Sequence, residues 1–128
     1  MTSPAEADSK PTIIVCITCR RPEDPEEAPR AGAALAQALE AAADPATVTI
    51  RPVQCLANCK RGPSAALSRP GAWTYVFGGL GSAEDGAALL QGAGLLAASQ
   101  DGLLPWRGRP EILKRGMICR IPPMESPA

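Results

Sequence analysis

The sequence contains no histidine. This absence excludes Cys₂His₂ zinc sites, Rieske-type iron–sulfur ligation and every nucleophile that is paired with a histidine base. It also removes the side chain that most often acts as a general acid or base near neutral pH. We therefore predict that the chain is not an enzyme.

Aromatic residues are scarce, at 3% of the chain, although the hydrophobic fraction is 45%. The apolar content must come largely from alanine, leucine and valine, and a core of small side chains is shallow because each buried CH₂ contributes only about 0.8 kcal/mol. Fourteen prolines and twelve glycines indicate long ordered loops. A metal bound between two loops would offset this deficit, since metal binding to the folded state adds to the folding free energy.

The chain also lacks net charge and long apolar runs. Thirteen basic residues balance thirteen acidic ones, so nothing indicates binding to nucleic acid or to an anionic membrane. No apolar run approaches the roughly 20 residues that span a bilayer, and Met1–Lys10 has no apolar signal-peptide segment. We expect a cytoplasmic protein, in which five cysteines indicate metal ligands or redox groups rather than structural disulfides.

Hydrophobic patterning predicts an α/β fold. Residues 12–17 form a short apolar, β-branched run that is typical of a buried strand. A capping pattern at 24–27 predicts the start of a helix, which Asp44-Pro45 ends. Alternation over 47–53 predicts a second strand, parallel to the first because a helix connects them.

The second half of the domain is predicted to begin with a hairpin. Strands at 65–68 and 73–77 flank the turn Arg69-Pro70-Gly71-Ala72. A second capping pattern at 82–85 opens a helix to about Ser99, and one short helix is expected at 111–115. The predicted order is β-α-β-β-β-α, with a mixed sheet.

These elements divide the chain into three parts. Residues 1–11 are expected to be a disordered lead-in and residues 12–99 the metal-binding domain. Residues 100–128 are rich in proline and glycine and are expected to form an extension packed on that domain.

Four of the five cysteines lie in two close pairs. Cys16 and Cys19 end the first strand, and Cys55 and Cys59 follow the second. The carboxyl ends of two parallel strands meet at one edge of a sheet, so we predict that these four thiols form one metal site. Cys119 lies apart from them, and we interpret it as a small buried hydrophobic residue.

The residues alone leave three uses of these thiols open. Four thiolates suit an iron–sulfur cluster, and they also suit zinc, which tolerates two to four residues between paired ligands. Dithiol redox chemistry requires a CxxC pair at the N-terminus of a helix. Arg20, Arg21 and Pro22 separate Cys19 from the predicted helix, so we favour a metal site over a dithiol.

From Cys55 onward, the sequence resembles the thioredoxin-like [2Fe-2S] ferredoxins. The matching features are the Cys55-x₃-Cys59 pair, Gly62-Pro63, Pro70-Gly71 and Trp73-Thr74-Tyr75. The resemblance implies a thioredoxin-like fold, a [2Fe-2S] cluster on the four paired cysteines, one-electron transfer and a homodimer. Those ferredoxins space their first two cysteines more widely, so zinc in a structural or metal-delivery role remains the alternative.

The chain is also similar to a bacterial family of predicted metal-binding proteins of unknown function. That family has a Cys-x₂-Cys-Arg motif after its first strand and a Cys-Leu-x₂-Cys loop, as this chain has from Cys16 and from Cys55. It also shares the segments at 104–107 and 120–123. This similarity covers nearly the whole chain after the first ten residues.

Basic residues follow both cysteine pairs, as Arg20-Arg21 and Lys60-Arg61. Such residues usually form solvated surface. Beside a cluster they would also steer a redox partner protein with an acidic docking face.

Two further expectations concern single residues. The resemblance implies that Pro63 follows a cis peptide bond beside the second cysteine loop. Trp106, Arg107 and Arg109 form a polar–aromatic cluster, in which we expect the tryptophan to close the core with an arginine over its ring; docking of a partner is the alternative role.

Overall fold

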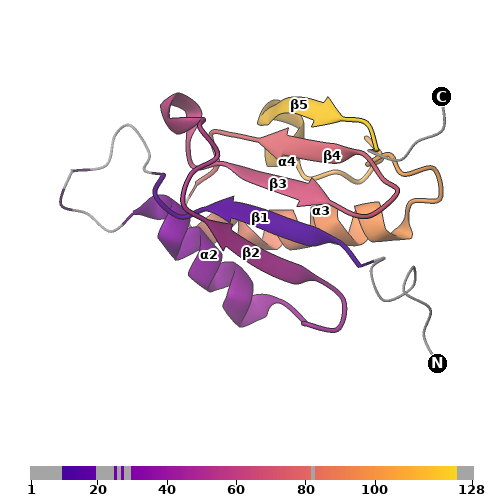
Figure 1. The fold of residues 1–128 in the computed structure, drawn as a ribbon, viewed down its shortest axis with the longest axis horizontal. Helices are drawn as coiled ribbons and strands as arrows, with labels where there is room; N and C mark the ends of the chain where they lie inside the picture. Colours follow the sequence, from indigo (N-terminus) through magenta and orange to yellow (C-terminus); the bar gives the residue numbers. More distant parts are fainter. Residues whose placement is uncertain (1–9, 20–24, 26, 28–29, 82, 124–128) are drawn as a thin grey trace.

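The computed structural model describes residues 10–19, 25, 27, 30–81 and 83–123. Five strands form one sheet in the order β2-β1-β3-β4-β5, and helices α2, α3 and α4 cover one of its faces (Figure 1). The strands are β1 (Thr12–Cys16), β2 (Thr49–Val53), β3 (Ala65–Ser68), β4 (Thr74–Phe77) and β5 (Met117–Ile121). The helices are α2 (Ala31–Ala42), α3 (Gly86–Ala98) and α4 (Glu111–Arg115), with 3₁₀ turns η1 (Cys59–Arg61) and η2 (Ala83–Asp85).

The sheet is mixed, as predicted. β1 and β2 run parallel, with Ile13 opposite Ile50, and α2 makes the crossover between them. All other neighbouring strands are antiparallel, with Ile14 opposite Ala66 between β1 and β3. Because β1 and β2 are parallel, the two cysteine pairs leave the sheet at the same edge.

The core lies between the sheet and the helices. Alternate strand residues point toward the helices and are fully buried, as the period of two in a strand requires. The principal core side chains are Ile13, Val15, Ala65, Leu67, Tyr75 and Phe77 from the strands and Leu35, Leu39, Leu89, Leu96 and Leu113 from the helices. The layers are close together: a Cβ on Gly92 would lie 2.6 Å from Leu113 Cδ1 and 3.0 Å from Leu67 Cδ1. This close packing compensates for the shortage of large side chains.

The predicted hairpin is confirmed. β3 and β4 are joined through the turn that contains Pro70 and Gly71, and Gly71 has φ = 79°, a left-handed conformation that favours glycine. The backbone N–H of Ala72 donates to the carbonyl of Arg69 at 3.0 Å and closes the turn.

The first helix begins later than predicted. α2 starts at Ala31, and Arg30 is its N-cap without a side-chain hydrogen bond, whereas Asp24, the predicted cap, lies outside the described residues. The prediction overlooked Pro29, which has no N–H to donate in a helix that starts at Pro25. The predicted cap of the second helix, Ser82, also lies outside the described residues, and α3 begins at Gly86 after η2.

The fifth strand was not predicted. The short helix α4 forms as expected over Glu111–Arg115, but residues Met117–Ile121 then pair with β4 as β5, with an irregularity between Val76 and Phe77. β5 is one edge of the sheet and runs directly into Pro122-Pro123, and the other edge, β2, contains Pro52.

Tyr75 and Arg109 connect the segment before α4 to the sheet. The hydroxyl of buried Tyr75 accepts a hydrogen bond from the backbone N–H of Leu104 at 2.8 Å. Arg109, also buried, donates to the carbonyl oxygens of Leu104 and Pro105 at 2.7 and 3.2 Å. In the described part of the chain, no helix is long and apolar enough to cross a bilayer.

Candidate metal centre

The first cysteine pair lies at the end of β1. Cys16 is the last residue of this strand, and the side chains of Cys16 and Cys19 are both buried. Their Sγ atoms are 2.9 Å apart and share a hydrogen bond. A zinc–sulfur bond is about 2.3 Å long, so two thiolates on one tetrahedral ion lie roughly 3.8 Å apart, and these two sulfurs would separate by about 1 Å to bind the same ion.

Both neighbouring strands fix the position of this pair. The N–H of Cys16 donates to the carbonyl of Ser64 at 3.1 Å, just before β3. The N–H of Ile17 donates to the carbonyl of Val53 at 2.9 Å, at the end of β2. The first cysteine loop therefore starts from a rigid strand end.

The first turn of α2 packs directly beneath this loop. The N–H of Gly32 donates to the carbonyl of Cys19 at 3.0 Å, and a Cβ on Gly32 would lie only 2.0 Å from the carbonyl oxygen of Cys16. Only glycine allows this approach. It brings the positive end of the helix macrodipole close to the two thiols, where negative charge is favoured.

The environment of Cys16 favours its thiolate. Burial acts to raise the pKa of Cys16, but hydrogen bonds from the Cys19 side chain and from the backbones of Leu56 and Thr18 lower this pKa below its ordinary value. A thiolate, not a thiol, is the metal ligand and the nucleophile. Leu56, on the second cysteine loop, is thus one of the groups that lower this pKa.

Cys55 lies on that second loop, directly after β2, and its side chain is exposed. Its Sγ accepts a hydrogen bond from the N–H of Ala57 at 3.1 Å. Ala57 has φ = 59°, a left-handed conformation that few residues with a Cβ adopt. The loop is thus bent back so that a backbone donor faces a cysteine sulfur.

The two loops are joined at Gln54. Its carbonyl oxygen accepts hydrogen bonds from the Thr18 hydroxyl and, at 3.5 Å, from the Cys16 thiol. Thr18 itself lies between the two cysteines of the first pair. The prediction that the pairs converge at one sheet edge therefore holds for the loop backbones.

The fourth predicted ligand is only partly described. Cys59 begins η1, but its side chain lies outside the described residues. Among the side chains that the structure describes, no three cysteine, aspartate or glutamate residues gather into a metal site. The structure brings Cys16 and Cys19 together, places Cys55 on the adjoining loop, and leaves the four-cysteine set as a prediction.

The end of the second loop is fixed against β3. The Gly62–Pro63 peptide bond is cis, as the resemblance implied, and the carbonyl of Pro63 accepts from the N–H of Leu80 at 3.1 Å. Asn58 Nδ2 donates to the hydroxyl of fully buried Ser64 at 2.9 Å. Lys60 and Arg61 are exposed on this loop, whereas Arg20 and Arg21 lie outside the described residues.

Two residues outside the loops differ from their predicted roles. Cys119 was interpreted as buried but is exposed, because it lies on the edge strand β5 that the sequence analysis missed. Trp106 was expected to close the core, yet it is 59% exposed. The expected arginine does lie over its ring: Arg109 Cζ is 4.9 Å from the ring centroid, while Arg107 is exposed.

The donor set suits a soft metal ion. Two thiols lie in contact, one has a lowered pKa, and a backbone N–H points at a third sulfur. Thiolates select zinc, copper(I) and iron–sulfur clusters over hard cations. The supporting roles of Thr18 and Gly32 were not predicted from the sequence. A glycine in the interior of the predicted helix was the available signal for Gly32, because glycine weakens a helix unless a close approach requires it.

Residues 13–123 match the model of a protein family that is described as "Protein of unknown function (DUF1636)". The chain belongs to this family. No curated protein matches the sequence of this DUF1636 member.

Solved structures are similar to this DUF1636 chain in fold. A thioredoxin-like [2Fe-2S] ferredoxin from Aquifex aeolicus has a TM-score of 0.55 and 19% identity, over 93% of this chain and 96% of that chain. A second structure of that ferredoxin, the wild type at 1.5 Å resolution, has a TM-score of 0.53 and 20% identity, over 87% of this chain and 98% of that chain. These similarities confirm that the fold is thioredoxin-like.

Proposed function

We propose that this chain is a cytoplasmic one-electron carrier that holds a [2Fe-2S] cluster on Cys16, Cys19, Cys55 and Cys59. The observation that carries the proposal is the buried pair of Cys16 and Cys19 sulfurs, 2.9 Å apart, beneath a second cysteine loop that is hydrogen-bonded to the first at Gln54. The chain shares its fold with ferredoxins that bind such a cluster.

The chain's own residues supply what such a centre needs. When bound, a [2Fe-2S] cluster provides a one-electron redox couple. The Ala57 N–H donates to the Cys55 sulfur, and such a hydrogen bond stabilises negative charge there. Burial of Cys16 and Cys19 excludes water from one side of the centre, while the exposure of Cys55 leaves the other side accessible to a partner.

The test is purification without oxygen, followed by visible absorption and assays of iron, sulfide and zinc on the same sample. We expect a red-brown protein with about two irons and two sulfides per chain. A colourless protein with about one zinc per chain would contradict the electron-carrier function and establish a structural or metal-delivery role. A metal-free protein would leave a dithiol at Cys16 and Cys19.

Serine variants identify the ligands. Changing Cys16, Cys19, Cys55 or Cys59 to serine is expected to remove or shift the visible absorption. Cys119→Ser is the matched control, because Cys119 is exposed on β5, and its absorption should equal that of the unmodified protein. A loss of iron in the Cys119 variant comparable to that in the other four would refute the assignment.

A further inference from the structure

Positive charge is concentrated near the C-terminal end of the chain. Residues 102–121 contain five basic residues and one acidic residue, whereas the remainder contains eight basic and twelve acidic residues. The neutral total therefore conceals a positively charged segment, which includes α4 and β5, on an otherwise negatively charged chain. A charge difference of this kind orients partners as they approach.

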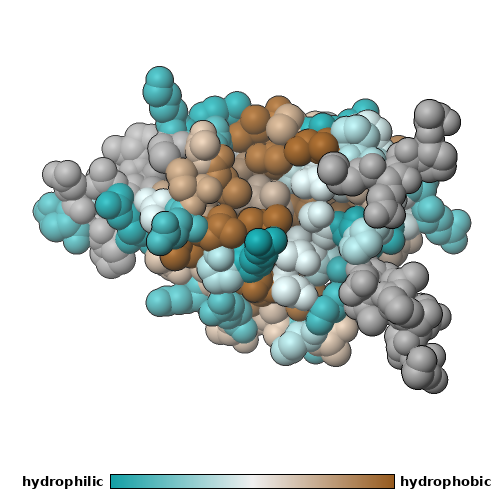
Figure 2. All heavy atoms as spheres, viewed as in Figure 1, coloured by the Kyte–Doolittle hydropathy of each residue, from teal (hydrophilic) through white to brown (hydrophobic). Residues whose placement is uncertain are grey.

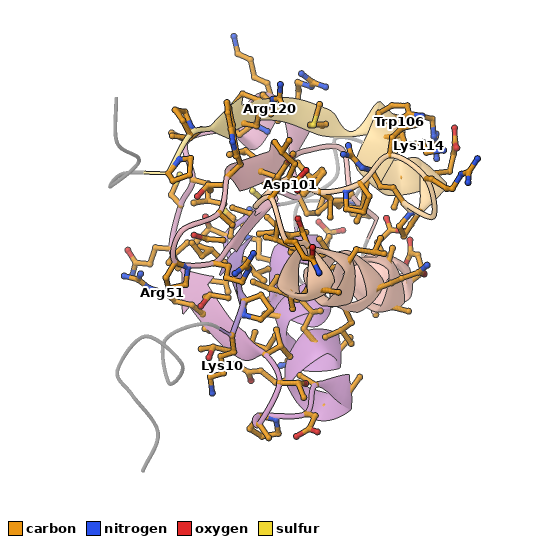
Figure 3. All side chains as sticks on the ribbon, turned by 90° about the vertical axis from the view of Figure 1, so that its right-hand side faces the viewer. Lys10, Arg51, Asp101, Trp106, Lys114 and Arg120 are labelled. Atoms are coloured by element: carbon orange, nitrogen blue, oxygen red, sulfur yellow. The ribbon has the colours of Figure 1, made fainter. Side chains whose placement is uncertain are left out.

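An exposed tryptophan lies in this segment. Trp106 is 59% exposed, and its ring is flanked by Arg109 Cζ at 4.9 Å and Lys114 Nζ at 5.1 Å from the centroid. Figure 3 shows Trp106 and Lys114 side by side at one corner of the molecule. Arg109 is fixed by its hydrogen bonds to two carbonyl oxygens, so the ring rests on a rigid support. Exposed tryptophans that are held in place are frequent anchors of protein interfaces.

The C-terminal end of α4 meets the second cysteine loop through two glycines. The N–H of Gly78 donates to the carbonyl of Gly116 at 2.8 Å, and the N–H of Gly79 donates to the carbonyl of Arg61. A Cβ on Gly78 would lie 2.7 Å from Asn58 Nδ2 and 2.8 Å from the Arg61 carbonyl oxygen. The backbones of η1 and of Gly116, the residue after α4, therefore both contact the Gly78-Gly79 dipeptide.

Both elements at this junction carry basic side chains. Lys60 and Arg61 are exposed in η1, and Arg115 is exposed and Lys114 half-buried at the end of α4. Hydrophilic side chains project from the corner of the molecule where η1 lies (Figure 2). Within the described part of the chain, none of these four side chains is in an ion pair with a carboxylate. Their charges are thus available to a partner.

We propose that Lys60, Arg61, Trp106, Lys114 and Arg115 form a docking surface for an acidic protein, here called the basic docking surface. It adjoins the loop that carries Cys55 and Cys59, so a partner seated there lies next to the centre. This inference rests on the proposed electron-carrier function for its biological purpose, but the surface itself is a property of the chain with or without a metal.

Carboxylates, rather than nucleic acid phosphates, fit this surface better. The buried guanidinium of Arg109 donates within the chain, to Leu104 and Pro105, and so supports the Trp106 ring instead of binding phosphate. A protein interface typically combines an aromatic anchor of this kind with a charged rim. Nucleic-acid surfaces instead carry a large excess of available cations, and this chain has no net charge.

The test measures binding of fluorescently labelled poly-L-glutamate to the purified protein by anisotropy. Arg61→Gln with Arg115→Gln removes two charges from the basic docking surface. The matched control is Lys10→Gln with Arg51→Gln, which removes two charges from the opposite side of the molecule (Figure 3). At low salt, the first double variant should bind poly-L-glutamate roughly three- to tenfold more weakly than the unmodified protein. The control variant should bind it as tightly as the unmodified protein. Trp106→Ala should weaken binding while leaving the net charge unchanged.

Three outcomes would overturn the inference. The first is equal loss of binding in both double variants, which would indicate non-specific attraction. The second is tighter binding to a DNA duplex than to poly-L-glutamate, with the same dependence on Arg61 and Arg115, which would assign the surface to nucleic acid. The third is that the unmodified protein is a homodimer and the Arg61, Arg115 double variant is a monomer. That result would show that a second copy of the chain binds to this surface. Absorption and iron content of the same samples test the electron-carrier function separately, so failure of either proposal is visible on its own.

Discussion

The hydroxyl of Thr18 donates a hydrogen bond to the carbonyl oxygen of Gln54, and so connects the loop between Cys16 and Cys19 to the residue before Cys55. This contact joins the two cysteine loops without using a cysteine side chain. The geometry of the candidate centre is therefore partly set before any metal binds.

Thr18→Val keeps the shape of this side chain and removes the hydroxyl. One lost hydrogen bond is worth about 0.5–1.5 kcal/mol, so we expect metal to leave roughly two- to tenfold faster. The measurement is the rate of metal transfer to a coloured chelator from the protein as purified. Thr18→Ser should restore the slow rate, and identical release rates in all three proteins would show that the Thr18–Gln54 contact does not hold the centre.

Gly32→Ala places a methyl group 2.0 Å from the Cys16 carbonyl oxygen. Backbone cannot move aside easily, so we expect a loss of about 1–3 kcal/mol in the free energy of unfolding by urea. Gly94→Ala is the matched control, because nothing lies within 4 Å of its added Cβ in α3. It should raise stability by up to about 1 kcal/mol through helix propensity. A Gly32 variant as stable as the Gly94 variant would argue against the close packing of α2 on the first cysteine loop.

Arg109→Lys retains the positive charge but lacks the planar group that reaches both the Leu104 and Pro105 carbonyls. We expect a loss of about 2–3 kcal/mol of unfolding free energy, because a buried acceptor is left unsatisfied. Arg107→Lys changes an exposed side chain and should alter stability by less than about 0.5 kcal/mol. Equal urea midpoints for the two variants would contradict a structural role for Arg109.

Asp101 gives a prediction for pH. Hydrogen bonds from the Ser99 hydroxyl at 2.8 Å and the Leu103 N–H at 3.0 Å lower the pKa of Asp101 below its ordinary value. A carboxyl group whose pKa is lower in the folded state stabilises the fold above its unfolded pKa, about 3.9, and this contribution is lost as pH falls through the folded pKa. Asp101→Asn should therefore lower stability at neutral pH, and the difference from the unmodified protein should shrink in acid. A difference that stays constant from neutral pH down to acid would show that the charge of Asp101 is not the cause.

The strands and turns that depend on local sequence were predictable. Pro70-Gly71 specifies its own turn, because proline fixes φ and glycine permits the left-handed conformation. The β-branched side chains of residues 12–17 indicate a buried strand, and the structure has β1 there. The helix at Glu111–Arg115 ends at Gly116, as its sequence indicates.

Features that depend on long-range pairing were not predictable. β5 is a strand because β4 offers it a free edge, and five residues between Gly116 and Pro122 carry too little periodicity to reveal that. The error about Cys119 follows from this omission. Likewise, the pairing of Cys16 with Cys19 was visible in their spacing, but the contacts of Thr18 with Gln54 and of Gly32 with Cys16 join residues that are far apart in the chain.

The prolines at the two edges of the sheet have a consequence for behaviour at high concentration. An open strand edge normally offers unpaired N–H and C=O groups to another chain and can begin fibril growth. Here Pro52 interrupts the row of donors on β2, and Pro122-Pro123 end β5 immediately after Ile121. A strand from another chain would therefore meet a missing donor on β2 and a row of groups that stops at Ile121 on β5, and both features limit growth of the mixed sheet when the protein is concentrated.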